Sequence, residues 1–445
     1  MLRSNGKHTA LIAALTLVGL GLTVWVFYPG VMTYDAKFVY EDVLKGFRGD
    51  WQSPVMTSLW ALIDPISPGS ASMFFLIAGL YWLGFGLLAA TISRRSLPVA
   101  LVLLLLAAAP PAFLFVGIIW RDVLFAGTWL TAAAVCFAVS DRQPAVRLPF
   151  QAVTIALIAL GVLLRPNALF AAPLILAYAL WPAGFRFKRT AILFIPAALA
   201  FYGLIQLTYY GVLHAARQNI VQSIMVFDLA GISHFAQENQ FPIAWTADEE
   251  RQLLTTCYKP KEWDIYWRLD PCQFVMRRLE KEQHLFGTPA VPHAWLRAMA
   301  RHPIAYLEHR VAFFWNFTTR DNLTLWVFNI EDLSKPALNG RAGFAALEAI
   351  DQALKATPLL RVGSWLLLCA GVCVVAWRRR ETPEGAFALG VAGSGVLYVA
   401  TFLPLGVASD FRYGYWSVIA GLAGAAVLAA RQAEGTSVID AAPLA

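Results

Sequence analysis

The sequence predicts an all-α polytopic membrane protein with about ten transmembrane helices and a long outer loop domain. Hydrophobic residues make up 58% of the 445 residues and charged residues only 14%, whereas soluble domains contain about 25% charged residues. Long apolar runs recur along the chain, and the connections between them are alternately rich and poor in basic residues. The net charge is +7, but basic runs reach only three residues. The charge therefore indicates orienting loops and phosphate sites, and we expect no nucleic-acid partner.

Ten stretches approach the roughly 20 apolar residues that a membrane span needs. The predicted spans are 9–27, 73–92, 97–119, 123–139, 150–164, 167–181, 190–212, 359–377, 386–405 and 415–430. They divide the chain into a transmembrane region at 1–213 that includes the first outer loop at 29–72, an extracytoplasmic domain at 214–358, and a C-terminal transmembrane region at 359–445.

The alternation of basic connections predicts the orientation. Basic residues follow the second span at Arg94 and Arg95, precede the seventh at 186–189, and follow the eighth at 378–380. Since cytoplasmic loops carry the excess of Lys and Arg, both ends of the chain are expected in the cytoplasm. The prediction is a multi-pass protein of the inner (plasma) membrane with its other loops outside.

The first outer loop carries a carboxylate directly after the first span. Thr33 is a good N-cap for a short helix that runs to about Lys45, and Gly46 is suited to end it. That helix would present Asp35 and Asp42 on one face, seven residues apart. Asp35 alone is explained as well by the helix dipole, which favours acids in the first turn.

Two features predict irregular backbone at membrane depth. Pro110-Pro111 should break the third span before its outer end, either as an ordinary kink or as the lining of a cavity. The hairpin at 150–181 offers only 15 residues to each helix, which is about 23 Å against about 30 Å of hydrocarbon. Its tip, Arg165-Pro166-Asn167, is therefore expected below the outer surface.

The long loop at 214–358 is too polar to span. It contains Cys257 and Cys272, the two cysteines outside apolar runs, which would form a disulfide if the loop is extracytoplasmic. It also contains an amphipathic stretch at 293–314. That stretch would lie on the outer membrane surface or form a core helix of a small soluble domain; both interpretations stay open.

Three further charged sites fall at predicted outer span ends. Charge at such places is costly to bury and indicates pairing or function. Arginine grips phosphate at two points and a carboxylate can accept a proton, so together they suit a transfer whose leaving group is a lipid phosphate. The sites are Trp120-Arg121-Asp122, Leu164-Arg165-Pro166-Asn167 and Ser409-Asp410-Phe411-Arg412-Tyr413.

With Asp35, these motifs resemble the membrane glycosyltransferases of the C-type fold, which use polyprenyl-phosphate sugars. Protein O-mannosyltransferases and the aminoarabinose transferases of lipid A belong to this group. The order of spans, with one long outer loop late in the chain, is also similar. The resemblance covers most of the chain, and each motif is short.

The resemblance implies an inverting transfer at the outer face in which Asp35 is the base on the acceptor and Asp122 a second acid. Arg121, Arg165 and Arg412 would hold the donor phosphate, and Arg165 has the strongest case because of its short hairpin. Asn167, Tyr413 and Asp42 complete the predicted substrate-binding set. Many members carry two adjacent acids in the first loop, whereas here Tyr34 precedes Asp35 and the adjacent acids are Glu41-Asp42. Asp42 is thus a rival base, and the departure leaves a divalent cation open.

The implied partners are a polyprenyl-phosphate-linked sugar, an acceptor glycan, lipid or protein, and the membrane lipids. Two other classes compete: a transporter or flippase of lipid-linked saccharides, and a non-catalytic membrane scaffold. A transporter should show internal repeats and charges near mid-span. The sequence shows neither, and its charges gather at one face. We find no spacing typical of zinc ligands, of a P-loop or of a serine hydrolase.

Overall fold

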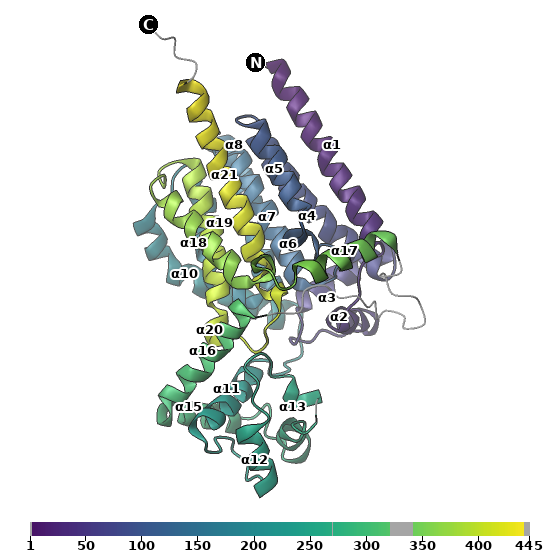
Figure 1. The fold of residues 1–445 in the computed structure, drawn as a ribbon, viewed down its shortest axis with the longest axis vertical. Helices are drawn as coiled ribbons and strands as arrows, with labels where there is room; N and C mark the ends of the chain where they lie inside the picture. Colours follow the sequence, from purple (N-terminus) through teal and green to yellow (C-terminus); the bar gives the residue numbers. More distant parts are fainter. Residues whose placement is uncertain (1, 269, 321–340, 440–445) are drawn as a thin grey trace.

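The computed structural model describes residues 2–268, 270–320 and 341–439. This part of the chain forms helices and isolated β-bridges and contains no sheet. Figure 1 shows a bundle of long helices with both chain ends at one end and a smaller helical domain at the other. The fold class predicted from the sequence, an α-helical polytopic protein with a long loop domain, is confirmed.

Seven helical segments within the described residues are long and apolar enough to cross a membrane. They belong to α1 (Leu2–Phe27), α4 (Ser70–Ile92), α7 (Arg121–Ala138), α8 (Pro144–Leu164), α10 (Phe187–Gln206), α19 (Pro383–Ala400) and α21 (Tyr415–Ile439). The three other predicted spans correspond to the shorter helices α5 (Leu97–Ala107), α9 (Ala172–Leu180) and α18 (Val362–Trp377).

Helix α7 lies inside the bundle, because its apolar segment is 83% buried. It packs against α4, α8 and α21. Small residues permit the close approach, since a Cβ added at Gly161 of α8 would overlap the Trp129 ring of α7. Aromatic rings fill the remaining space: the rings of Trp129 and Trp416 meet at 5.3 Å.

The predicted short hairpin at 150–181 is wrong in its first half. α8 begins at Pro144, keeps Pro149 inside the helix, and reaches Leu164. At 1.5 Å per residue its 21 residues extend about 31 Å, enough to cross the hydrocarbon. The polar start around Arg147 had masked the first turn. The length of α8 therefore gives no reason to place Arg165 below the outer surface.

Pro110-Pro111 does break the third span. α5 ends at Ala107, and α6 (Pro110–Phe113) is followed by a turn at 114–117 and an isolated bridge at Ile118. This backbone pairs with the first outer loop, because the Val31 amide donates to the Gly117 carbonyl at 2.8 Å and the Ile119 amide to the Val31 carbonyl at 3.1 Å. The break thus carries the chain past Val31 and into the start of α7.

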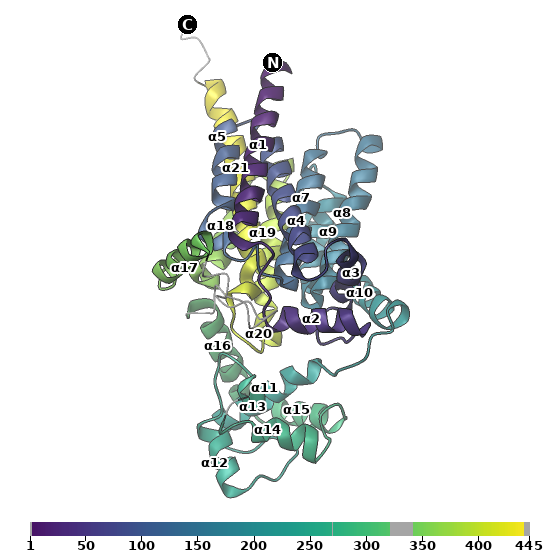
Figure 2. The ribbon, with the colours of Figure 1, turned by 90° about the vertical axis from the view of Figure 1, so that its right-hand side faces the viewer.

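The loop domain is built from α11 (Val221–Ala236), α12 (Ala247–Thr255), α13 (Ile265–Arg268), α14 (Phe274–Met276) and α15 (Ala290–Arg301). Figure 2 shows it below the bundle, joined by α16 (Pro303–Thr319). Near the end of the segment 214–358, α17 (Ala342–Leu354) packs on α1 of the bundle.

The predicted amphipathic stretch at 293–314 is two helices, divided at His302-Pro303. α16 has two different apolar faces. Phe313 and Phe317 are fully buried, whereas Ile304, Leu307 and Val311 are 71%, 59% and 59% exposed. The exposed stripe is what a helix at the membrane surface needs, and the buried stripe is what a core helix needs, so α16 combines the two interpretations.

Candidate functional site

The first outer loop is tied to the start of α7 through its helix cap. Thr33 is the N-cap of α2 (Tyr34–Lys45), and its hydroxyl oxygen accepts from the Ala36 amide; Gly46 ends the helix in the left-handed conformation. Both predicted caps are confirmed. The same Thr33 oxygen accepts a 2.8 Å hydrogen bond from the Trp120 indole N–H. Asp35, in the first turn of α2, is thereby fixed beside Arg121 and Asp122.

Asp35 forms an ion pair with Arg412, which lies 377 positions later. Arg412 Nη1 is 2.6 Å from Asp35 Oδ2. The other carboxylate oxygen accepts from Gln52 Nε2 at 3.3 Å. The Asp35 side chain is 40% exposed and that of Arg412 only 12%. Asp35 is therefore an accessible carboxylate held in place by a mostly buried arginine.

Arg412 is enclosed on its other sides. Its Nε lies 3.0 Å from Asp410 Oδ2. Its guanidinium sits 4.4 Å from the centre of the Trp120 ring and 5.0 Å from that of Tyr413. Asp410 also caps the short helix η7 (Phe411–Gly414) by accepting from the Arg412 amide at 3.1 Å. Arg412 thus touches two carboxylates and two aromatic rings.

Arg165 is the most deeply placed of the predicted arginines, with 7% of its surface exposed. Its Nε lies 3.0 Å from Asp122 Oδ1 and 3.2 Å from the Tyr398 hydroxyl. Asn167 hydrogen-bonds the same hydroxyl. The Tyr413 ring centre is 4.9 Å from the Arg165 guanidinium, so one aromatic ring contacts both Arg165 and Arg412.

Arg121 differs from the other two arginines. Among the described residues, no carboxylate oxygen lies within the 4.0 Å limit of an ion pair with it. Its Nη1 donates a long hydrogen bond of 3.4 Å to the Trp51 carbonyl. Of the three, Arg121 therefore has the guanidinium most available to a ligand.

The electrostatics show that the three arginines share one site. Partial burial opposes ionisation of Asp35, but the charge and hydrogen bond of Arg412 outweigh it, and the charges of Arg121 and Arg165 add to the effect, so the pKa of Asp35 is lowered. Asp410 shows the opposite balance. Burial raises its pKa to about 6, against the favourable charge of Arg412. Six residues accordingly form what we call the site cluster: Asp35, Arg121, Asp122, Arg165, Asp410 and Arg412.

The structure does not bring Asp42 into the site cluster. Asp42 lies two turns further along α2, about 10 Å from Asp35 along the helix axis. Burial raises the pKa of Asp42, and the nearby charges of Lys45 and Glu41 act on it in opposite directions. Of the predicted substrate-binding residues, Tyr413 and Asn167 are present at the site and Asp42 stands apart.

Three residues at the site are not among those predicted from the sequence. Tyr398 lies within an apolar span, and Gln52 and Trp51 lie in an ordinary polar stretch of the first loop. Of these, Trp51 and Gln52 could have been found by their place after the short helix, where a second polar stretch returns toward the membrane. Tyr398 could not, because a tyrosine in a buried span is usually core.

The cysteine-bounded loop is a further element at the site. Cys257 and Cys272 are joined, with their Cα atoms 5.4 Å apart. Between them, the Trp263 amide donates to the Val407 carbonyl at 2.9 Å and the Ser409 amide donates to the Lys261 carbonyl at 2.6 Å. The Trp263 ring centre is 5.9 Å from that of Trp51. The loop therefore holds the strand-like segment that leads directly into Asp410.

A divalent cation does not fit the site cluster as it is formed. Asp35 and Asp122 are each bound to an arginine. Within the described part of the chain, no group of three or more His, Cys, Asp or Glu side chains is arranged to hold a metal ion. We derive no chemical step through a metal.

No known family model matches the chain, and no curated protein matches it. Among solved structures, it is similar to the oligosaccharyltransferase of Archaeoglobus fulgidus in complex with zinc and sulfate, at 12% identity and a TM-score of 0.39 over 96% of this chain and 51% of that one. It is also similar to ArnT from Cupriavidus metallidurans bound to undecaprenyl phosphate, at 13% identity and a TM-score of 0.33 over 89% and 77% of the two chains.

This chain thus spans about half the length of the archaeal oligosaccharyltransferase. Function has to be argued from the site cluster itself.

Proposed function

We propose that this protein is a glycosyltransferase that moves a sugar from a polyprenyl phosphate to an acceptor at the outer face of the membrane. One observation carries the proposal: at a single end of the bundle, an accessible carboxylate, Asp35, lies beside three arginines, one of which has no carboxylate partner among the described residues. An exposed acid next to unequally neutralised arginines suits a reaction that removes a proton and leaves a phosphate.

The acceptor hydroxyl would lose its proton to Asp35 as its oxygen attacks the anomeric carbon. The bond between that carbon and the phosphate oxygen breaks, and the polyprenyl phosphate leaves with the electron pair. Attack opposite the leaving group inverts the anomeric centre. A lowered pKa keeps Asp35 ionised at neutral pH, which a proton acceptor requires, although it limits its basicity.

The arginines have separate tasks in this mechanism. Arg121 would contact the phosphate directly, since no described carboxylate forms an ion pair with it. Arg412 orients Asp35 and offsets charge on the leaving group. Arg165 is fixed by Asp122, whose side chain is 4% exposed, so Asp122 acts as a positioning residue more than as a second acid.

The test is incubation of the purified protein with a panel of polyprenyl-phosphate sugars, scoring release of the free lipid phosphate. The proposal expects release with at least one donor from the wild type and none above background from Asp35→Asn. Movement of an intact lipid-linked saccharide across a liposome, without release of lipid phosphate, would instead indicate a transporter. A well-folded protein that neither cleaves nor moves any donor would contradict both.

A further inference from the structure

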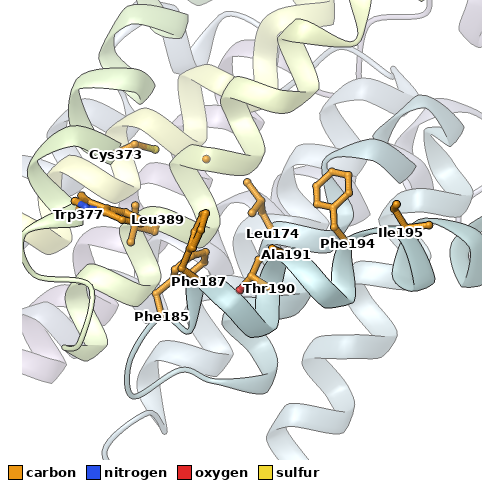
Figure 3. A pocket seen from close by; sticks show the side chains of 11 residues that line it. Leu174, Phe185, Phe187, Thr190, Ala191, Phe194, Ile195, Cys373, Trp377 and Leu389 are labelled. Atoms are coloured by element: carbon orange, nitrogen blue, oxygen red, sulfur yellow. The ribbon is translucent and has the colours of Figure 1, made fainter.

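A cavity of about 530 Å³ lies between α9, α10, α18 and α19, away from the site cluster. Figure 3 shows its shape: Trp377, Phe185 and Phe187 gather at one end, and Phe194 and Ile195 lie at the other. The rings of Phe187 and Trp377 meet edge to face at 5.4 Å. The lining is almost wholly apolar, and Ile195 is 68% exposed, so the cavity is open along the lipid-facing side of α10.

Basic residues adjoin the aromatic end of this cavity in the chain, next to Phe185, Phe187 and Trp377. Two basic loops meet there, because the Phe185 amide donates a 2.6 Å hydrogen bond to the Arg380 carbonyl. A second hollow of about 240 Å³ is lined by 378–382. We call the cationic side chains at the start of α10 (186–189) and in the segment 378–380 the basic rim, which consists of Arg186, Lys188, Arg189, Arg378, Arg379 and Arg380.

The basic rim is poorly neutralised among the described residues. Its one ion pair links Arg380 to Glu381 at 3.8 Å, and the Glu381 side chain is 79% exposed. Glu384, nearby in sequence, is buried and paired with Arg95. Nη1 of Arg379 is buried and has no hydrogen-bond partner within the described chain. A buried guanidinium nitrogen without a partner is costly unless an anion meets it.

We propose that this cavity and the basic rim bind one anionic phospholipid, with its phosphate headgroup on Arg378 and Arg379 and an acyl chain along α10. The volume lies within the range of about 300–1,000 Å³ that ligand sites occupy. Anionic lipid headgroups bind basic pockets between membrane helices. Orientation of the protein in the membrane would explain the basic loops alone, but it requires neither the apolar cavity beside them nor the unpartnered nitrogen of Arg379.

This lipid site is distinct from the proposed donor site. Val362, at the first residue of α18, lies against Gly414 beside the site cluster. Trp377, at the last residue of the same helix, lines the cavity. Fifteen residues of helix separate them, which is about 22 Å. The site therefore stands whether or not the protein is a glycosyltransferase.

The experiment is native mass spectrometry of the purified full-length protein in a neutral detergent, titrated with phosphatidylglycerol or with phosphatidylcholine of the same acyl chains. Wild type should bind phosphatidylglycerol more tightly. Arg378→Gln/Arg379→Gln should weaken that binding about 30-fold, because each arginine at a lipid surface contributes roughly a factor of five. Phosphatidylcholine binding should not change. Arg378→Lys/Arg379→Lys, which keeps the charge, should bind nearly as wild type.

Two controls separate the headgroup from the chain and from bulk charge. Arg94→Gln/Arg142→Gln removes two exposed arginines from other loops that are also predicted to be cytoplasmic. This variant should bind both lipids as wild type does. Ala191→Trp fills the cavity from the exposed face of α10 and should weaken both lipids. Equal binding of the two lipids by wild type, unaltered binding by Arg378→Gln/Arg379→Gln, or displacement of the lipid by millimolar inorganic phosphate would overturn the proposal.

Discussion

Two clusters of charged residues lie on either side of the segment 406–409, and they differ in solvent access and in how their charges are paired. The first is the site cluster. The second, which we call the Asp228 cluster, lies between α11 and α16 in the loop domain. It consists of Asp228, Tyr258, Trp295, His309 and Arg310.

In the Asp228 cluster the charged side chains are paired with one another and buried. Asp228 is 0% exposed; its Oδ1 lies 2.7 Å from Arg310 Nη2 and 3.1 Å from His309 Nε2. Its Oδ2 accepts from the Trp295 indole at 2.7 Å. Arg310 also donates to the Gly406 carbonyl at 2.7 Å. The Asp228 cluster therefore has a structural role, because it fixes the segment that leads to Asp410.

In the site cluster the same residue types are distributed unevenly. Two carboxylates contact Arg412, whereas Arg121 contacts none among the described residues, and Asp35 keeps 40% of its side chain exposed. Burial with complete pairing makes a charge structural, whereas access with incomplete pairing leaves it free to act on a ligand. The comparison predicts that mutations in the two clusters will have effects of different kinds.

The largest expected effect is on turnover. Asp35→Asn keeps the shape of the side chain and removes its basicity, so release of lipid phosphate should fall about 100-fold or more, with the melting temperature little changed. Asp42→Asn, on the same helix but outside the site cluster, is the matched control and should remain active. Near-normal turnover by Asp35→Asn together with an inactive Asp42→Asn would move the base to Asp42.

The next effect is on stability. Asp228→Asn leaves Arg310 buried without its counter-charge and should lower the free energy of unfolding by about 3–5 kcal/mol, while turnover per folded molecule falls much less than for Asp35→Asn. Denaturation in detergent, followed by helix content, measures it. Glu238→Gln removes an acid from an exposed 3.2 Å pair with Arg301 and should cost at most about 1 kcal/mol. Equal losses of unfolding free energy in the two variants would contradict a structural role for the Asp228 cluster.

How much of this could be predicted from the sequence depends on the range of the interaction. The cap at Thr33, the break at Pro110-Pro111 and the pairing of Cys257 with Cys272 depend on neighbouring residues and on counting cysteines, so local rules sufficed. The four charged motifs could be placed at one face because span order alone decides which ends of helices meet.

The pairings within that face could not be predicted. Asp35 and Arg412 are 377 positions apart, and nothing local states that Arg412 contacts Asp35 while Arg121 contacts no acid. The sequence favours Arg165 as the main phosphate ligand only if the helix before it is short, whereas α8 has 21 residues. Arg147 and Pro149 at its polar start hid the first turn, so the depth of Arg165 was inferred from a wrong length. Tyr398, in an apolar span, had no signal of its own.

The third effect depends on pH and tests whether the folded protein disfavours ionisation of Asp410. Burial raises its folded-state pKa from 3.8 to about 6. A raised pKa means that folding favours the neutral Asp410 carboxyl. The stability that this carboxyl contributes is therefore present below about pH 4 and is lost as the pH rises through about 6. Two pKa units correspond to roughly 3 kcal/mol. Asp410→Asn cannot ionise, so its melting temperature relative to wild type should rise between pH 4 and pH 7. A difference that stays flat with pH would contradict the raised pKa.

The smallest effect sharpens the comparison within the site cluster itself. If Arg121 is the arginine that meets the donor phosphate, Arg121→Lys keeps the charge and loses the two-point grip. Donor affinity should fall about tenfold, the weight of one charge-assisted hydrogen bond, with the melting temperature unchanged.

Arg165→Lys should behave differently, because Arg165 is 7% exposed and already bound by Asp122 and Tyr398. Lysine cannot reproduce both contacts from that position, so the variant should lose stability before it loses donor affinity. Arg412→Lys should lower turnover at saturating donor, since Arg412 holds Asp35 in place. Donor titration of the three purified variants, with melting curves alongside, separates these patterns. If all three variants keep wild-type turnover and donor affinity, the three arginines have a structural role like that of Arg310. The site cluster would then be structural too, with Arg121 as its one arginine without a described carboxylate partner. Arg165→Lys alone could instead lose donor affinity while keeping the wild-type melting temperature. The phosphate would then lie deeper than Arg121, between Tyr398 and Tyr413. In that case the sugar would have to extend from this phosphate to Asp35.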